Sequence, residues 1–294
     1  MTAVHSERHI YSSDGTELFL QRWAPEDTAA AELLVLHGYA EHSGRYRLFA
    51  HRMAAHGIAT VAVDLRGHGR SEGPRGYVEQ YEDFHADARA ALAQLQPSLP
   101  RFLLAHSNGG LVALDWLAVD ETSERQFSGL ILSNPYLALA FELPAWKRTA
   151  AEWAGRLWPR LALPSGIEPE LLSHDPTVVE AYRRDAFVFT TASAGFFRES
   201  TRAQTRVRGL PGTWDGLDIP LLYIYSDQDQ IALPHANREL AKALHAADKT
   251  VWEIPNAYHE VLNELDGEAL HDDIGAWIGE RIAASEPAEG GAGG

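Results

Sequence analysis

The chain has 294 residues, of which 45% are hydrophobic and 22% are charged, as is usual for a globular protein with a sizeable core. Its formal net charge of −16 argues against nucleic acid as a partner, because phosphates attract a basic surface. The absence of cysteine excludes disulfides and cysteine-ligated metal sites. The first residues lack the basic start and apolar run of a secretory signal, and no stretch approaches the roughly 18 apolar residues of a membrane span, so we expect a cytoplasmic protein.

Short apolar runs alternate with helical patterns over residues 1–135. The run ELFLQRW (17–23) alternates in hydrophobicity and predicts an edge strand. The elements predicted after it are a strand over 32–38, a helix over 45–56, a strand over 57–67, a helix over 82–95, a strand over 101–107, a helix over 108–119 and a strand over 129–135. Short apolar strands separated by helices predict an α/β fold with a mostly parallel, doubly wound sheet.

The strand–helix alternation stops between residues 136 and 215, where no strand of this kind recurs. The segment is rich in aromatic residues, some of them at helical spacing. We expect a mainly helical cap, inserted after a central strand and lying over the carboxyl edge of the sheet, where ligands bind in open α/β folds. Phe141, Trp146 and Trp153 are candidate substrate contacts from this cap.

The alternation resumes after residue 215. The predicted elements there are a strand over 219–226, a helix over 234–246, a strand over 250–255 and a helix over 266–282. This organisation predicts a core domain of residues 1–135 and 216–284, a cap of residues 136–215 and a disordered tail of residues 285–294, which is rich in glycine, alanine and glutamate.

The segment RFLLAHSNGG (101–110) fits a nucleophile elbow, in which a serine occupies a sharp turn between a strand and a helix. Small residues are needed two positions before and two after that serine. Gly109 supplies the second of them, whereas Ala105 stands where the motif G-x-S-x-G has its first glycine. Ser107 is therefore a candidate nucleophile, and the alternative is a tight turn with an idle serine.

A serine hydroxyl needs a base, and in this kind of fold the chain order is serine, acid, histidine. Of the 14 histidines, only His259 combines this order with a position after the last predicted strand. Two aspartates, Asp227 and Asp229, follow the strand before it, and spacing alone does not choose between them.

An oxyanion hole needs two backbone N–H donors. We expect one from Asn108, the residue after the nucleophile, and the other from Tyr39, which follows Gly38 in the loop after an apolar strand. We expect structural roles for other polar residues of the neighbouring motifs: Glu41, His42, Arg45, Arg66 and His68.

Taken together, these pieces resemble the monoacylglycerol lipase and lysophospholipase branch of the α/β-hydrolases, a serine aminopeptidase S33-like branch. The motifs that carry the resemblance are HGYAEHSGRY (37–46), DLRGHGRSEGPRGYV (64–78), AHSNGG (105–110), DQDQI (227–231) and YHEVLNE (258–264). It extends from about residue 8 to residue 282.

The resemblance implies a triad of Ser107, Asp229 and His259, and so favours Asp229 over its neighbour. It also implies that the backbone amides of Tyr39 and Asn108 form the oxyanion hole. The sequence departs from the family at the alanine of the elbow and at Asn108, where methionine or another apolar residue is usual.

The expected reaction is hydrolysis of a carboxylic ester of monoacylglycerol or lysophospholipid type through an acyl-enzyme, with no metal and no organic cofactor. The expected partners are a small ester that bears an acyl chain and, transiently, a lipid surface in contact with the cap. The alternatives are a carboxylesterase of small esters, a peptidase on the same scaffold and a non-catalytic ligand-binding relative. A serine at the elbow argues against the epoxide hydrolases and dehalogenases of this fold, which use an aspartate nucleophile.

Overall fold

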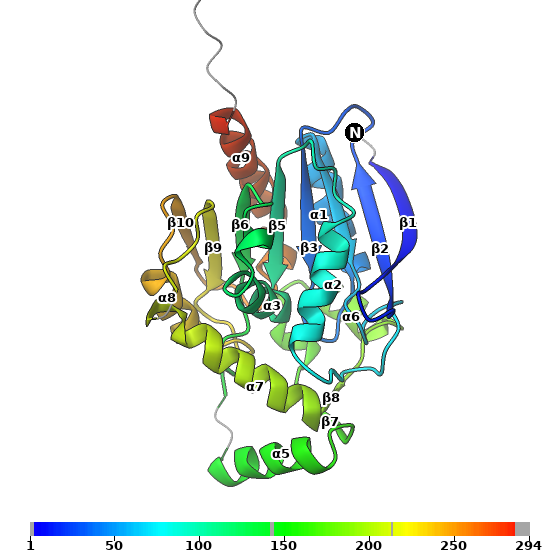
Figure 1. The fold of residues 1–294 in the computed structure, drawn as a ribbon, viewed down its shortest axis with the longest axis vertical. Coiled ribbons are helices and arrows are strands. Elements are labelled where there is room, and N and C mark those ends of the chain that lie inside the picture. Colours follow the sequence, from blue (N-terminus) through cyan, green and yellow to red (C-terminus); the bar gives the residue numbers. More distant parts are fainter. Residues whose placement is uncertain (1–2, 142–143, 213, 286–294) are drawn as a thin grey trace, which may run out of the picture.

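A mostly parallel sheet of eight strands forms the centre of the protein, in the order β1-β2-β4-β3-β5-β6-β9-β10 (Figure 1). The computed structural model describes residues 3–141, 144–212 and 214–285. The strands of this sheet are β1 (Val4–Tyr11), β2 (Glu17–Ala24), β3 (Ala31–Leu36), β4 (Ile58–Val63), β5 (Arg101–His106), β6 (Gly129–Ser133), β9 (Leu221–Ser226) and β10 (Lys249–Ile254). All pairings from β4 to β10 are parallel, and β1 and β2 add two antiparallel pairings at one edge. The predicted fold class is confirmed.

The edge strand differs from the prediction. The run 17–23 does form a strand, β2, but β1 pairs with it on the outside and is the true edge. Only Ile10 of β1 is buried. The sequence VHSERHIY therefore carries no apolar alternation to reveal it, and its charged side chains are typical of an exposed edge strand.

Helices cover both faces of the sheet (Figure 1). One face packs against α1 (Arg47–Ala55) and α9 (Gly267–Ser285), and the other against α2 (Glu82–Leu92), α3 (Asn108–Leu117) and α8 (Pro234–Ala243). The shorter helices of the core are η1 (Ser43–Tyr46), α4 (Glu121–Glu124) and η4 (Val261–Asn263). Ser285 ends α9, so the rest of the predicted tail lies outside the described residues.

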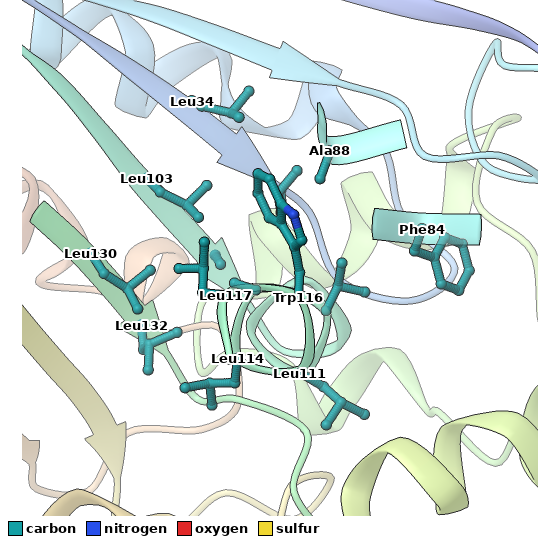
Figure 2. Packing of buried hydrophobic residues seen from close by; sticks show 14 of the residues in the cluster. Leu34, Phe84, Ala88, Leu103, Leu111, Leu114, Trp116, Leu117, Leu130 and Leu132 are labelled. Carbon is teal, nitrogen blue, oxygen red and sulfur yellow. The ribbon is translucent and has the colours of Figure 1, made fainter. Parts of the chain in front are cut away.

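Strand β5 shows how the two faces are built. Its side chains alternate between two buried clusters, with Phe102 and Leu104 on the α1 and α9 side and Leu103 on the other. Figure 2 shows Leu103 beside Trp116 and Leu117 of α3. A strand buried on both faces reads as a continuous apolar run, which is why the sequence predicts it well. This rigid centre holds the end of β5, where Ser107 follows.

Residues 136–215, between β6 and β9, are called the cap segment here. Its elements are α5 (Ala145–Leu157), β7 (Ala162–Pro164), η2 (Pro169–Leu171), α6 (Pro176–Arg184), β8 (Thr191–Ser193), α7 (Ala194–Gly209) and η3 (Leu210–Gly212). Figure 1 shows α5 and α7 beyond the carboxyl ends of the sheet strands. The small antiparallel sheet of β7 and β8 was not predicted, because three residues are too few to show a period of two. Within the described ranges, no helix combines the length and apolar character needed to cross a bilayer.

Candidate active site

Ser107 lies in a strained turn between β5 and α3. Its φ of 52° and ψ of −116° fall outside the regions that residues with a side chain usually adopt, as a nucleophile elbow requires. A Cβ atom added at Gly109 would lie 2.3 Å from the Leu36 carbonyl oxygen, so that position must be glycine. Ala105 is fully buried in the core cluster, and its methyl group fits there. The alanine therefore leaves the elbow intact.

Ser107, His259 and Asp229 form a continuous chain of hydrogen bonds. His259 Nε2 lies 2.8 Å from Ser107 Oγ, and His259 Nδ1 lies 2.6 Å from Asp229 Oδ2. A carboxylate only accepts hydrogen bonds, so Nδ1 carries the proton and Nε2 presents its lone pair to the serine hydroxyl. The three residues come from loops at the carboxyl ends of β5, β9 and β10.

The structure separates the two candidate aspartates. Asp229 is buried, and its second oxygen, Oδ1, accepts hydrogen bonds from the Ile231 and Ala232 amides at 2.7 and 2.9 Å. Asp227 is exposed and accepts instead from the Asn256 amide at 2.7 Å, as a turn residue does. Of these two aspartates, it is Asp229 that contacts His259.

Tyr39 and Asn108 both lie beside Ser107. Asn108 follows it as the first residue of α3, so its amide belongs to the helix N-terminus, which favours negative charge. A Cβ atom added at Gly38 would lie 3.1 Å from Ser107 Cβ, so the loop before Tyr39 runs directly against the serine. The Gly38 amide is already used, because it donates to Glu41 at 2.6 Å.

A buried ionic cluster links this loop to the loop of His259. Arg45 donates two hydrogen bonds to Glu260, at 2.5 and 2.7 Å, and a third to Glu41 at 3.0 Å. Glu260 directly follows His259, and sequence reasoning did not single it out. The available signal was an arginine in the motif 37–46 and a glutamate in the motif 258–264. These opposite charges are far apart in the sequence, and only the fold brings them together.

The other polar residues have contacts of their own. His42 Nε2 lies 2.9 Å from Asp185 of the cap segment, and Arg66 forms a buried pair with Asp87 at 2.7 Å. His68 Nδ1 lies 3.0 Å from the carbonyl oxygen of Arg66. These contacts fit the structural roles expected for the three residues.

The charges around His259 act on its basicity. Burial lowers the pKa of His259, but the Asp229 carboxylate and the charge of Glu260 outweigh burial and bring the pKa above its ordinary value of 6.5. Burial and the nearby His259 lower the pKa of His106 to about 4. Burial also lowers the pKa of His68 to about 3. Of these three histidines, His259 is thus the one whose pKa lies above its ordinary value.

A cavity of about 560 Å³ opens beside Ser107. Its lining is mostly apolar and comes largely from the cap segment, including Phe196 and Phe197 of α7. Phe141 and Trp146, two of the candidate substrate contacts, are among the residues that line it. Its volume and lining suit an acyl chain better than a polar ligand.

Trp153, the third candidate contact, lies apart from this cavity. This residue is not part of the cavity lining among the described residues, and 56% of its surface is exposed. The lining face of α5 runs through Trp146, Ala150, Ala151 and Ala154. The Trp153 ring instead lies under the Arg156 guanidinium, 5.6 Å from its centroid.

The fold and this hydrogen-bonded serine, histidine and aspartate define an α/β-hydrolase of the serine type. Residues 27–266 match the family described as serine aminopeptidase, S33. The chain belongs to this family.

Individual relatives and a solved structure support the assignment. The chain is 31% identical to the monoglyceride lipase of Mus musculus over 94% of this chain and 91% of the lipase. It is also 31% identical to an uncharacterized abhydrolase domain-containing protein of Dictyostelium discoideum, over 94% of this chain but only 29% of that longer protein. The crystal structure of the monoacylglycerol lipase of Paleococcus ferrophilus superposes with a TM-score of 0.78 at 27% identity, covering 96% of this chain and all of that chain. The protein is a serine ester hydrolase.

Proposed function

We propose that the protein hydrolyses carboxylic esters of lipid-like substrates of the monoacylglycerol or lysophospholipid type. The observation that carries this proposal is the opening of an apolar cavity of about 560 Å³ at Ser107, whose hydroxyl is hydrogen-bonded to His259. The names of the lipase relatives support the same substrate class.

The proposed reaction is a two-step acyl transfer. Ser107 Oγ attacks the ester carbonyl while its proton passes to His259 Nε2. Asp229 holds the imidazole in the required tautomer and stabilises the imidazolium. The negative charge on the carbonyl oxygen is stabilised by the amides of Tyr39 and Asn108, each worth about 3 kcal/mol in the transition state.

His259 then gives its proton to the leaving alcohol oxygen, and the acyl group remains as an ester on Ser107. A water molecule attacks this acyl-enzyme as His259 takes one of its protons. Collapse of the second tetrahedral intermediate releases the fatty acid and returns the proton to Ser107. The chemistry needs neither a metal nor an organic cofactor.

A comparison of monoacylglycerol, lysophospholipid and p-nitrophenyl esters tests the substrate class. Each buried methylene is worth about 0.8 kcal/mol, roughly a factor of four in kcat/KM. We therefore expect kcat/KM for p-nitrophenyl octanoate to exceed that for the acetate by more than about tenfold. A preference for acetate would contradict the lipid proposal and favour a carboxylesterase of small esters.

A pair of variants on α5 makes this test specific for the cavity. Ala154→Phe fills part of the cavity and should remove most of the octanoyl preference while leaving acetate hydrolysis unchanged. Trp153→Ala is the matched control, because this side chain lies on the same helix outside the cavity lining.

The raised pKa of His259 predicts the pH dependence of kcat/KM. Protonated imidazole cannot accept the Ser107 proton, so activity should fall as the pH drops through a midpoint above 6.5. Glu260→Gln removes one of the negative charges that raise this pKa, and its midpoint should move to lower pH. Glu268→Gln, whose side chain is exposed, is the control and should leave the midpoint in place. A wild-type midpoint at or below 6.5 would contradict the prediction.

A further inference from the structure

The side chain of Tyr39 reaches from the loop beside Ser107 into the cap segment. Its hydroxyl donates a hydrogen bond to the Thr191 carbonyl oxygen of β8 at 2.8 Å, and the Gly76 carbonyl oxygen lies 3.4 Å away. A Cβ atom added at Gly76 would lie 2.5 Å from the Tyr39 hydroxyl and 2.8 Å from the Thr191 oxygen. The hydroxyl is therefore enclosed where the Tyr39 loop, β8 and the segment of Gly76 meet, and position 76 has room only for glycine.

The ring of Tyr39 is held by aromatic neighbours. It stacks on Phe196 of α7 with a centroid distance of 4.1 Å and an interplanar angle of 26°. Phe189 of the cap segment and His68 of the core meet it edge-on at 5.4 and 5.5 Å. Burial raises the pKa of the Tyr39 hydroxyl, so it stays a protonated donor. The ring has little freedom to move unless the cap segment moves too.

The backbone of Tyr39 is equally constrained. On one side Gly38 lies against Ser107, and its amide is tied to Glu41. On the other side Ala40 has a φ of 62°, a conformation that side-chain-bearing residues rarely adopt. The Ala40 carbonyl oxygen accepts a hydrogen bond from the Phe189 amide at 3.4 Å. The loop is thus short, strained and docked on the cap segment by both backbone and side chain.

We propose that Tyr39 is a positioning residue that couples the placement of the cap segment to the geometry of the oxyanion hole. This rests on the proposed function, in which the Tyr39 amide binds the oxyanion. An oxyanion donor acts only within about 3 Å of the developing charge, so a small shift of the loop weakens it. An acyl chain packed against the cap aromatics favours the docked loop. Binding energy from the acyl chain of the substrate then raises kcat as well as lowering KM.

Tyr39→Phe tests the coupling, because it keeps the ring and removes only the hydroxyl group that donates a hydrogen bond to the Thr191 carbonyl oxygen of β8. The substrates are p-nitrophenyl octanoate and its thionoester, in which sulfur replaces the carbonyl oxygen and accepts hydrogen bonds weakly. We expect kcat for the ester to fall by about tenfold, and the ester-to-thionoester ratio of kcat to fall by about the same factor, with KM changed less than about twofold. If Tyr39 had a purely structural or substrate-binding role, the variant would lower kcat for the ester and for the thionoester by the same factor.

Tyr223→Phe is the matched control. It removes a buried hydroxyl that donates to Asn237 at 2.8 Å in the core, and it should leave the ester-to-thionoester ratio unchanged. Phe196→Leu is a second test from the cap side, because it removes the stacked ring, and the ratio should fall as in Tyr39→Phe. If Tyr39→Phe does not fold, Phe196→Leu decides the question.

An unchanged ester-to-thionoester ratio of kcat in folded Tyr39→Phe overturns the coupling. This holds whether kcat is retained or falls by the same factor for both substrates. That outcome would leave ester hydrolysis by the wild-type enzyme in place. Failure of the wild-type protein to hydrolyse any ester would instead overturn the proposed function itself.

Discussion

Ser107→Ala is expected to lower kcat for p-nitrophenyl octanoate by about a million-fold, the effect of removing a triad nucleophile in a serine hydrolase. The remaining residues can bind and polarise the ester, but no oxygen is left to form the acyl-enzyme. The same variant should lose all labelling by a fluorophosphonate probe, which reacts with an activated serine. Stopped-flow or steady-state kinetics and intact-protein mass spectrometry measure the two effects.

Ser200→Ala is the matched control for this experiment. Ser200 lines the same cavity, but its hydroxyl donates to the Phe197 carbonyl oxygen at 3.2 Å rather than to a histidine. It should be labelled like the wild type and should retain most of its activity. Equal labelling of the wild type and of Ser107→Ala would show that another residue is the nucleophile.

Asp229→Asn is expected to lower kcat by about 10⁴-fold with little change in KM. Its amide can donate a hydrogen bond to His259 Nδ1, which stabilises the tautomer that carries the proton on Nε2. That tautomer presents a donor instead of a lone pair to Ser107, so the base is lost although the geometry is kept. Turnover of a p-nitrophenyl ester over a range of concentrations separates kcat from KM.

Asp227→Asn provides the comparison within the same loop. Asp227 uses one oxygen to accept from the Asn256 amide, and asparagine has a carbonyl oxygen that can do the same. We therefore expect turnover within about threefold of the wild type. If Asp227→Asn lost activity and Asp229→Asn kept it, the acid of the proposed triad would be the wrong aspartate.

The comparison of these aspartates shows where sequence reasoning reaches its limit. The order of strands placed both residues at the correct edge of the sheet, because the carboxyl ends of parallel strands share an edge. Which of them faces His259 depends on a turn in which Asp229 accepts from the Ile231 and Ala232 amides. Spacing does not encode that turn, and only the family resemblance favoured Asp229.

Other differences have similar physical causes. The sequence predicts the buried strands and the elbow because continuous apolar runs and small residues are needed there. It misses β1, whose exposed side chains follow no apolar period. It offers Trp146 and Trp153 together as candidate contacts, and residues seven apart align closely on a helix, yet among the described residues Trp146 lines the cavity and Trp153 does not. How far a helix is rotated about its axis depends on its neighbours in space.

The position of the cap segment also bears on how such enzymes diversify. This segment is the connection between β6 and β9, which are neighbours in the sheet. Its length and composition can therefore change while both strands keep their pairing, and Asp229 and His259 keep their places after β9 and β10. Changes within this one crossover can therefore reshape the lining of the cavity while the strands that precede Ser107, Asp229 and His259 keep their pairing.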